Sequence, residues 1–120
     1  MTMPDDQAEF RRWILAVLDG VAADSIRQIR SLRSVGVGVD ELMLELDDAL
    51  VTAQAKHREG LLDDEELAIL DHVGDHVDAM PPSPGPLWTE AALGEAPEWR
   101  ELRELAAEAH ASLAKLWAEG

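Results

Sequence analysis

The chain has 120 residues, of which 47% are hydrophobic, and its formal net charge is -15. That length fits a single domain, and the apolar content is too high for a disordered chain. The absence of cysteine excludes disulfide bonds, thiolate metal ligands and a cysteine nucleophile, and it is consistent with a reducing cytosol. We therefore expect one cytoplasmic domain without a signal peptide or a membrane-spanning segment.

The negative charge is concentrated in the middle of the chain. Residues 1–39 carry five acidic and five basic residues, whereas residues 40–80 carry thirteen acidic residues against only Lys56 and Arg58. Such a surface repels nucleic acids and anionic membranes, and it attracts cationic partners. The charge distribution therefore favours either a basic protein partner or an acidic surface that is simply solvated, and it disfavours a nucleic acid or a membrane.

The first helix is expected over about residues 5–34, with Asp5 as its N-cap. Gly20 lies inside this segment, but one long helix is favoured over two short ones. The apolar side chains of the segment recur at intervals of three, four or five residues. They are Phe10, Ile14, Val17, Val21, Ile26, Ile29 and Leu32.

The second helix is expected over about residues 40–59, with Asp40 as its cap and Gly60 as its C-terminal stop. Its core stripe consists of Val39, Leu42, Met43, Leu46, Leu50 and Ala53. Leu44 and Val51 lie off that stripe, which gives the helix apolar side chains on more than one side. This second apolar face indicates a further neighbour, which could be a second copy of the chain.

The third helix is expected over about residues 64–80, where Asp63 and Glu66 have the spacing of a capping box. A proline-rich linker, 81–88, follows and cannot be helical.

Thr89 is expected to cap a short helix, 90–93, that Gly94 closes, and the last helix covers about 97–118 with Pro97 in its first turn. These elements predict an all-α domain, arranged as an antiparallel four-helix bundle.

The histidines give the only candidate metal site. His72 and His76 are four residues apart, so one helix face can present both to a transition metal. Projected around the helix, however, His72 faces away from the apolar stripe and His76 lies at its edge. We therefore expect neither a metal nor another cofactor, and a metal-binding bundle that uses this pair is an alternative.

Catalytic signals are weak in this sequence. No serine lies in a nucleophile turn, and the glycines at 36 and 38 lack the strand and the lysine of a phosphate-binding loop. Carboxylate pairs are too abundant to be informative. The sequence therefore predicts that the protein is not an enzyme.

The acidic clusters and one tryptophan are the predicted partner-binding residues. The acidic residues are Glu41, Glu45, Asp47 and Asp48 in the second helix, and Asp63, Asp64 and Glu65 at the start of the third. A cationic surface, such as the cleft of a nuclease that must be blocked, fits them by charge. Trp88 follows the linker and is the tryptophan expected to serve as an exposed anchor, although core packing of the indoles is the simpler interpretation.

Two pairs of short segments carry a resemblance. They are Val39-Asp40-Glu41-Leu42 with Leu46-Asp47-Asp48-Ala49, and Leu87-Trp88-Thr89-Glu90 with Ala96-Pro97-Glu98-Trp99. In these segments the chain resembles small helical proteins of GC-rich bacteria, and the resemblance implies no activity. By size, charge and helical content it is also similar to immunity proteins that neutralise bacterial toxins, but no motif of theirs is matched residue by residue.

The predicted function is non-catalytic protein binding. Its most concrete form is an immunity or antitoxin-like inhibitor that covers a basic partner with residues 40–80. The alternatives are the metal-binding bundle, a structural homo-oligomer built on Leu44 and Val51, and a bundle that holds a small ligand beside His57 or His110.

Overall fold

The computed structural model describes residues 6–81 and 85–119, and every regular element in these ranges is a helix. The helices are α1 (Asp6–Ala22), α2 (Ser25–Val35), α3 (Asp40–Arg58), α4 (Asp64–Ala79), α5 (Glu90–Glu95) and α6 (Pro97–Glu119). The predicted all-α class is therefore confirmed. The predicted cap Asp5 and linker residues 82–84 lie outside the described residues.

The prediction of one long first helix is wrong, because the segment forms two helices. The chain leaves α1 at Ala22 and starts α2 at Ser25, where the carboxylate of Asp24 accepts a hydrogen bond from the Arg27 amide at 2.9 Å. The break therefore comes after Gly20, not at it. Asp24 supplies the N-cap that a second helix needs, and Ile26, expected in the core, is 68% exposed on α2.

Of the other predicted helix ends, two agree with the structure and two do not. Asp63 and Glu66 form the predicted capping box, with bonds of 2.8 and 2.9 Å, and Pro97 begins α6. The predicted cap Asp40 is wrong: the N-cap of α3 is Val39, which lacks a capping side chain. Gly94 does not close α5 either, because the helix continues to Glu95 and ends at Ala96, just before Pro97.

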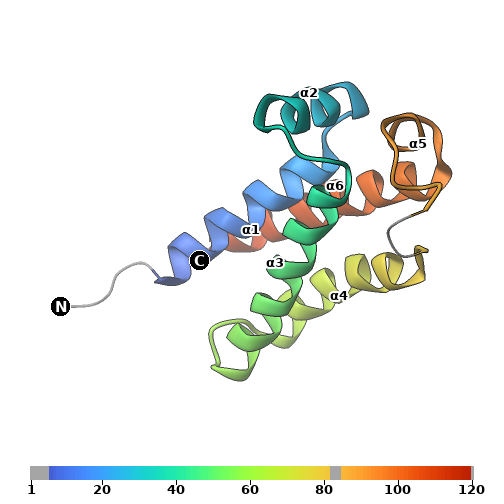
Figure 1. The fold of residues 1–120 in the computed structure, drawn as a ribbon. Coiled ribbons are helices and arrows are strands. Elements are labelled where there is room, and N and C mark those ends of the chain that lie inside the picture. Colours follow the sequence, from blue (N-terminus) through green and yellow to red (C-terminus); the bar gives the residue numbers. More distant parts are fainter. Residues whose placement is uncertain (1–5, 82–84, 120) are drawn as a thin grey trace.

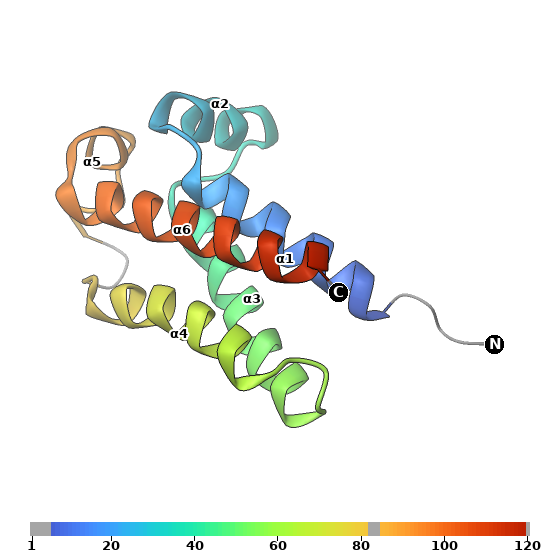
Figure 2. The same ribbon diagram turned by 180° about the vertical axis from the view of Figure 1, so that it is seen from behind.

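The four longer helices contact one another in a ring. α6 packs against α1 and α4, and α3 packs against α4 and α1. Figures 1 and 2 show α6 lying along α1, with the C-terminal end of the chain beside the first turns of α1. α2 packs against α5, and both lie at the end of the molecule opposite the loop between α3 and α4.

One apolar core draws on all six helices. Its largest fully buried side chains include Trp99, Ile14, Leu18, Leu46, Leu70 and Leu102. Trp99 also donates a hydrogen bond from Nε1 to the Leu87 carbonyl at 2.7 Å, which attaches the end of the linker to α6. None of the helices in the described ranges is both long enough and apolar enough to cross a bilayer.

Candidate functional site

The candidate site is a groove between α3 and α4. Two adjoining hollows of ≈ 320 and ≈ 510 Å³ lie along it, and Asp47 and Asp78 line both. On α3 the lining runs from Asp40 to Gln54, which is about 21 Å at the helical rise of 1.5 Å per residue. We call this surface the α3–α4 groove.

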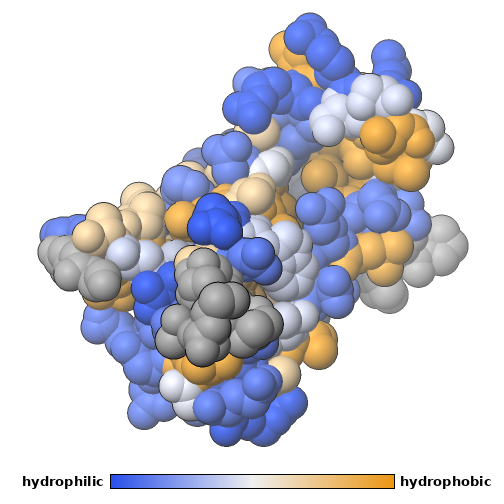
Figure 3. All heavy atoms as spheres, turned by 90° about the vertical axis from the view of Figure 1, so that its left-hand side faces the viewer, coloured by the Kyte–Doolittle hydropathy of each residue, from blue (hydrophilic) through white to orange (hydrophobic). Residues whose placement is uncertain are grey.

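Exposed apolar side chains lie in this groove. Leu44 is 57% exposed and Val51 is 64% exposed, and the two lie two turns apart on the same side of α3. Met43, Met80 and Trp88 line the hollow at the N-terminal end of α3. On the face of the molecule that Figure 3 shows, apolar surface lies in patches between hydrophilic side chains. The groove thus offers apolar contacts that are already open to a partner.

Carboxylates surround those apolar side chains. Asp40 and Asp47 come from α3, and Asp71, Asp75 and Asp78 come from α4. Partial removal of water from Asp47, and then the negative charge of Asp78, raise the pKa of the Asp47 carboxyl. None of the residues that line the groove is basic. A cationic group that enters the groove therefore relieves a repulsion between carboxylates.

The helix geometry divides the predicted acidic cluster of α3. All four acidic side chains are exposed, but Asp47 lines the groove and Glu41, Glu45 and Asp48 do not. At about 100° per residue these three side chains point roughly 100–160° away from Asp47. One partner surface that fills the groove therefore contacts Asp47 without contacting these three residues.

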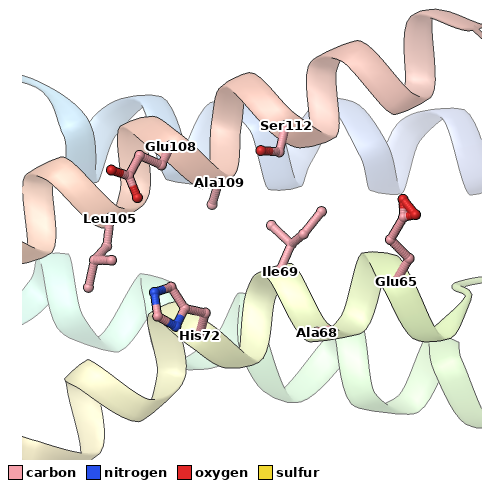
Figure 4. Close-up of a pocket in the computed structure, with 8 residues that line it drawn as sticks. All are labelled: Glu65, Ala68, Ile69, His72, Leu105, Glu108, Ala109 and Ser112. Carbon is pink, nitrogen blue, oxygen red and sulfur yellow. The ribbon is translucent and has the colours of Figure 1, made fainter.

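The second predicted cluster has three separate roles. Asp63 caps α4, and Asp64 accepts a contact from Nε2 of His57 at 2.7 Å. Glu65 lines a different hollow of ≈ 450 Å³, between α4 and α6. In Figure 4, Leu105 and Ala109 project from α6 toward Ile69 and His72 of α4 in that hollow. The structure therefore does not unite Asp63, Asp64 and Glu65 into one face.

Trp88 lies at the edge of the groove and is half-buried. Its ring meets Trp99 edge to face, with centroids 5.5 Å apart, and its Nε1 donates to the Pro81 carbonyl at 3.1 Å. Trp13 and Trp117 pack partly buried against the core. Trp88 therefore lines the groove and contacts the core at the same time.

His72 and His76 have different surroundings on α4. His72 is exposed in the α4–α6 hollow, and Nε2 of His76 lies 2.9 Å from the Glu98 carbonyl oxygen. Across the part of the chain that the structure describes, no three histidine or carboxylate side chains gather as metal ligands.

Three aspartates that line the groove were not predicted from the sequence. Asp71, Asp75 and Asp78 recur at spacings of four and three residues, which places them on one side of α4. That spacing is visible in the sequence, but only the packing of α4 against α3 shows that Asp78 meets Asp47.

Gln28 was also missed, and it is 2% exposed among apolar residues. Its role is structural, because its side chain donates to the carbonyls of Gly20 and Val21. The chain matches no protein-family model, no curated protein and no solved structure.

Proposed function

We propose that this protein is a non-catalytic binding protein whose α3–α4 groove receives a basic, amphipathic helix of a protein partner. One observation carries the proposal: exposed Leu44 and Val51 lie in a groove whose only charged lining residues are carboxylates. A helix with apolar side chains on one face and Lys or Arg at its borders complements both features. The apolar contacts supply affinity, and the charges supply steering and specificity.

The proposed action on the partner is steric. A cationic cleft that normally faces a polyanion is covered once its basic helix lies in the groove, and no bond is made or broken. The net charge of -15 accelerates the encounter with such a partner. An inhibitor of the immunity or antitoxin type, acting in the cytosol, is the form of the proposal that uses all of these features.

The packing of the long helices forms part of the same proposal. An antiparallel four-helix bundle of α1, α3, α4 and α6 presents α3 and α4 as a rigid pair. The contacts of α3 with α1, and of α4 with α6, support this arrangement. A groove between two supported helices keeps its shape before the partner arrives, which limits the entropy lost on binding.

The direct test uses a labelled synthetic peptide whose Leu and Lys residues alternate at helical spacing. Fluorescence anisotropy measures its affinity for the wild type, for Asp47→Asn/Asp78→Asn, and for the matched control Glu41→Gln/Glu45→Gln. The control removes two exposed carboxylates of α3 that do not line the groove. We expect the groove variant to bind about fivefold more weakly, the sum of two partly screened ion pairs.

The same variants identify the biological partner. A pull-down from the native host at low and high salt, read by mass spectrometry, should yield a basic protein that the groove variant retains less well than the control variant does. Equal weakening by the groove and control variants would show that only overall charge matters, and the groove would lose its role. Peptide binding unaffected by either pair of substitutions would place the binding surface elsewhere.

A further inference from the structure

α2 is the one strongly basic helix in this acidic chain. Its residues include Arg27, Arg30 and Arg33 and no acidic residue. Ile26 on the same helix is 68% exposed. With Ile29, Arg30 and Arg33 it lines a shallow hollow of ≈ 330 Å³. The exposed side of α2 is therefore both apolar and cationic, which is the chemistry that the α3–α4 groove complements.

The arginines of α2 are only partly neutralised within the chain. Arg33 forms a bidentate ion pair with Glu90 of α5 at 2.5 and 3.0 Å. Arg27 lies 3.7 Å from Asp19, and both side chains are more than 60% exposed. Arg30 has no ion-pair partner within residues 6–81 and 85–119. Arg27 and Arg30, one helical turn apart, thus remain accessible to carboxylates of another molecule.

The dimensions also agree. The eleven residues of α2 extend about 16 Å, and the groove extends about 21 Å along α3. α2 lies at the opposite end of the molecule from the loop that joins α3 to α4 (Figures 1 and 2). We propose that α2 of one copy docks into the α3–α4 groove of a second copy. This inference rests on the proposed function, because it requires that the groove accept a basic amphipathic helix.

The two surfaces in this contact are different, so the contact is heterologous. In a pair of copies, the one whose groove is filled keeps a free α2 and the other keeps a free groove, so the association continues as a ring or an open chain. A basic partner that enters the groove displaces α2 of the neighbouring copy. In the absence of a partner, α2 of a neighbouring copy therefore occupies the groove. Partner binding releases monomers.

Because each copy carries a large net charge, added salt should first strengthen the association and then weaken it. At very low ionic strength, two chains of charge -15 repel each other over long distances. At about 0.15 M salt the Debye length falls to about 8 Å, so the local attraction of arginine and aspartate remains while the long-range repulsion is screened. Near 1 M salt the local attraction weakens too. We expect the largest assemblies at intermediate ionic strength.

Sedimentation velocity of the full chain, in a concentration series up to about 1 mM, tests the proposal. The informative variants are Arg27→Gln/Arg30→Gln, which neutralises α2, and Asp47→Asn/Asp78→Asn, which neutralises the groove. Each variant alone should self-associate about fivefold more weakly than the wild type, because it loses two partly screened ion pairs. Their equimolar mixture should form a 1:1 complex that does not grow, because one supplies the groove and the other supplies α2. Glu41→Gln/Glu45→Gln should assemble like the wild type.

Circular dichroism verifies that each variant remains helical. The proposal is overturned if the wild type stays monomeric over the whole series, or if the mixture of the two variants forms no complex. If the labelled basic peptide still binds the groove in either case, the proposed function stands and only self-docking fails. Both proposals are overturned if the wild type does not bind the peptide and both neutralised variants assemble as strongly as the wild type.

Discussion

The side chain of Gln28 caps the C-terminus of α1 and contacts Arg103 in α6. Its Nε2 donates to the Val21 carbonyl at 2.8 Å and to the Gly20 carbonyl at 3.1 Å, both in the last turn of α1. Its Oε1 lies 3.5 Å from Nη1 of Arg103 in α6. The carbonyls at a helix C-terminus have no partner within their own helix. Gln28 supplies a donor to two of them, next to the buried side chains of Val21 and Ala23.

Replacement of Gln28 by Ala should therefore destabilise the fold by about 1–3 kcal/mol, the cost of leaving buried polar groups without partners. Equilibrium unfolding in urea measures the change. The matched control is Gln54→Ala, which removes the same side chain from an exposed position on α3. Equal effects of the two substitutions would show that the Gln28 bonds contribute nothing beyond those of a surface glutamine.

Glu66 is a second buried polar residue with several partners. It is 7% exposed, completes the capping box with Asp63, and accepts a hydrogen bond from Nε1 of Trp117. Arg11 stacks over the Trp117 ring, with 5.4 Å between Cζ and the ring centroid, and its Nη2 lies 3.9 Å from the Glu66 carboxylate. The start of α4 is thereby attached to both α1 and α6.

Glu66→Ala should cost about 2–3 kcal/mol, because it removes half of a capping box and leaves Arg11 and Trp117 without their acceptor. The adjacent Glu65→Ala, at an exposed position, is the control and should change stability by less than about 0.5 kcal/mol. Urea unfolding gives the free energies, and the tryptophan emission spectrum should shift only for Glu66→Ala. Similar free energies for the two variants would contradict the role assigned to this cluster.

The sequence was most informative where the interaction is local. The capping box at Asp63 and the start of α6 at Pro97 each depend on residues within one helical turn, and both were predicted correctly. The break between α1 and α2 was missed because it depends on Gln28 reaching back seven and eight residues and on Arg103 in a distant helix.

The residues that line the candidate site could not be predicted from the periodicity of the sequence. The sequence identified α3 as acidic, but Glu41, Glu45 and Asp48 turn away from the groove that Asp47 lines. Which side of α3 meets a neighbour is decided by the packing of α4. The apolar pattern of a helix predicts which face is buried. It does not predict which of the polar residues beside that face will line a groove.

The edge-to-face pair of Trp88 and Trp99 gives a prediction about the linker. Trp99 is 1% exposed and donates to the Leu87 carbonyl at 2.7 Å, whereas the bond from Trp88 to Pro81 is at the surface. Trp99→Phe should cost about 2 kcal/mol, since it leaves a smaller ring and a carbonyl without its donor. Trp88→Phe should cost about 0.5 kcal/mol. Urea unfolding measures both, and the reverse order would contradict the assigned packing.

Asp47 predicts a specific dependence of stability on pH. Because partial burial and Asp78 raise its pKa above the usual 3.8, the folded chain binds this proton more tightly than the unfolded chain. The contribution of Asp47 to stability is therefore highest below pH 3.8, falls as the pH rises through the raised pKa, and stays low at neutral pH. Asp47→Asn should thus stabilise the fold at pH 7 but not at pH 3.5, in urea unfolding at both values. In an Asp78→Asn background the gain at pH 7 should shrink, because one of the two causes is gone. An increase in the free energy of unfolding that is the same at both pH values would mean that the charge on Asp47 does not destabilise the fold.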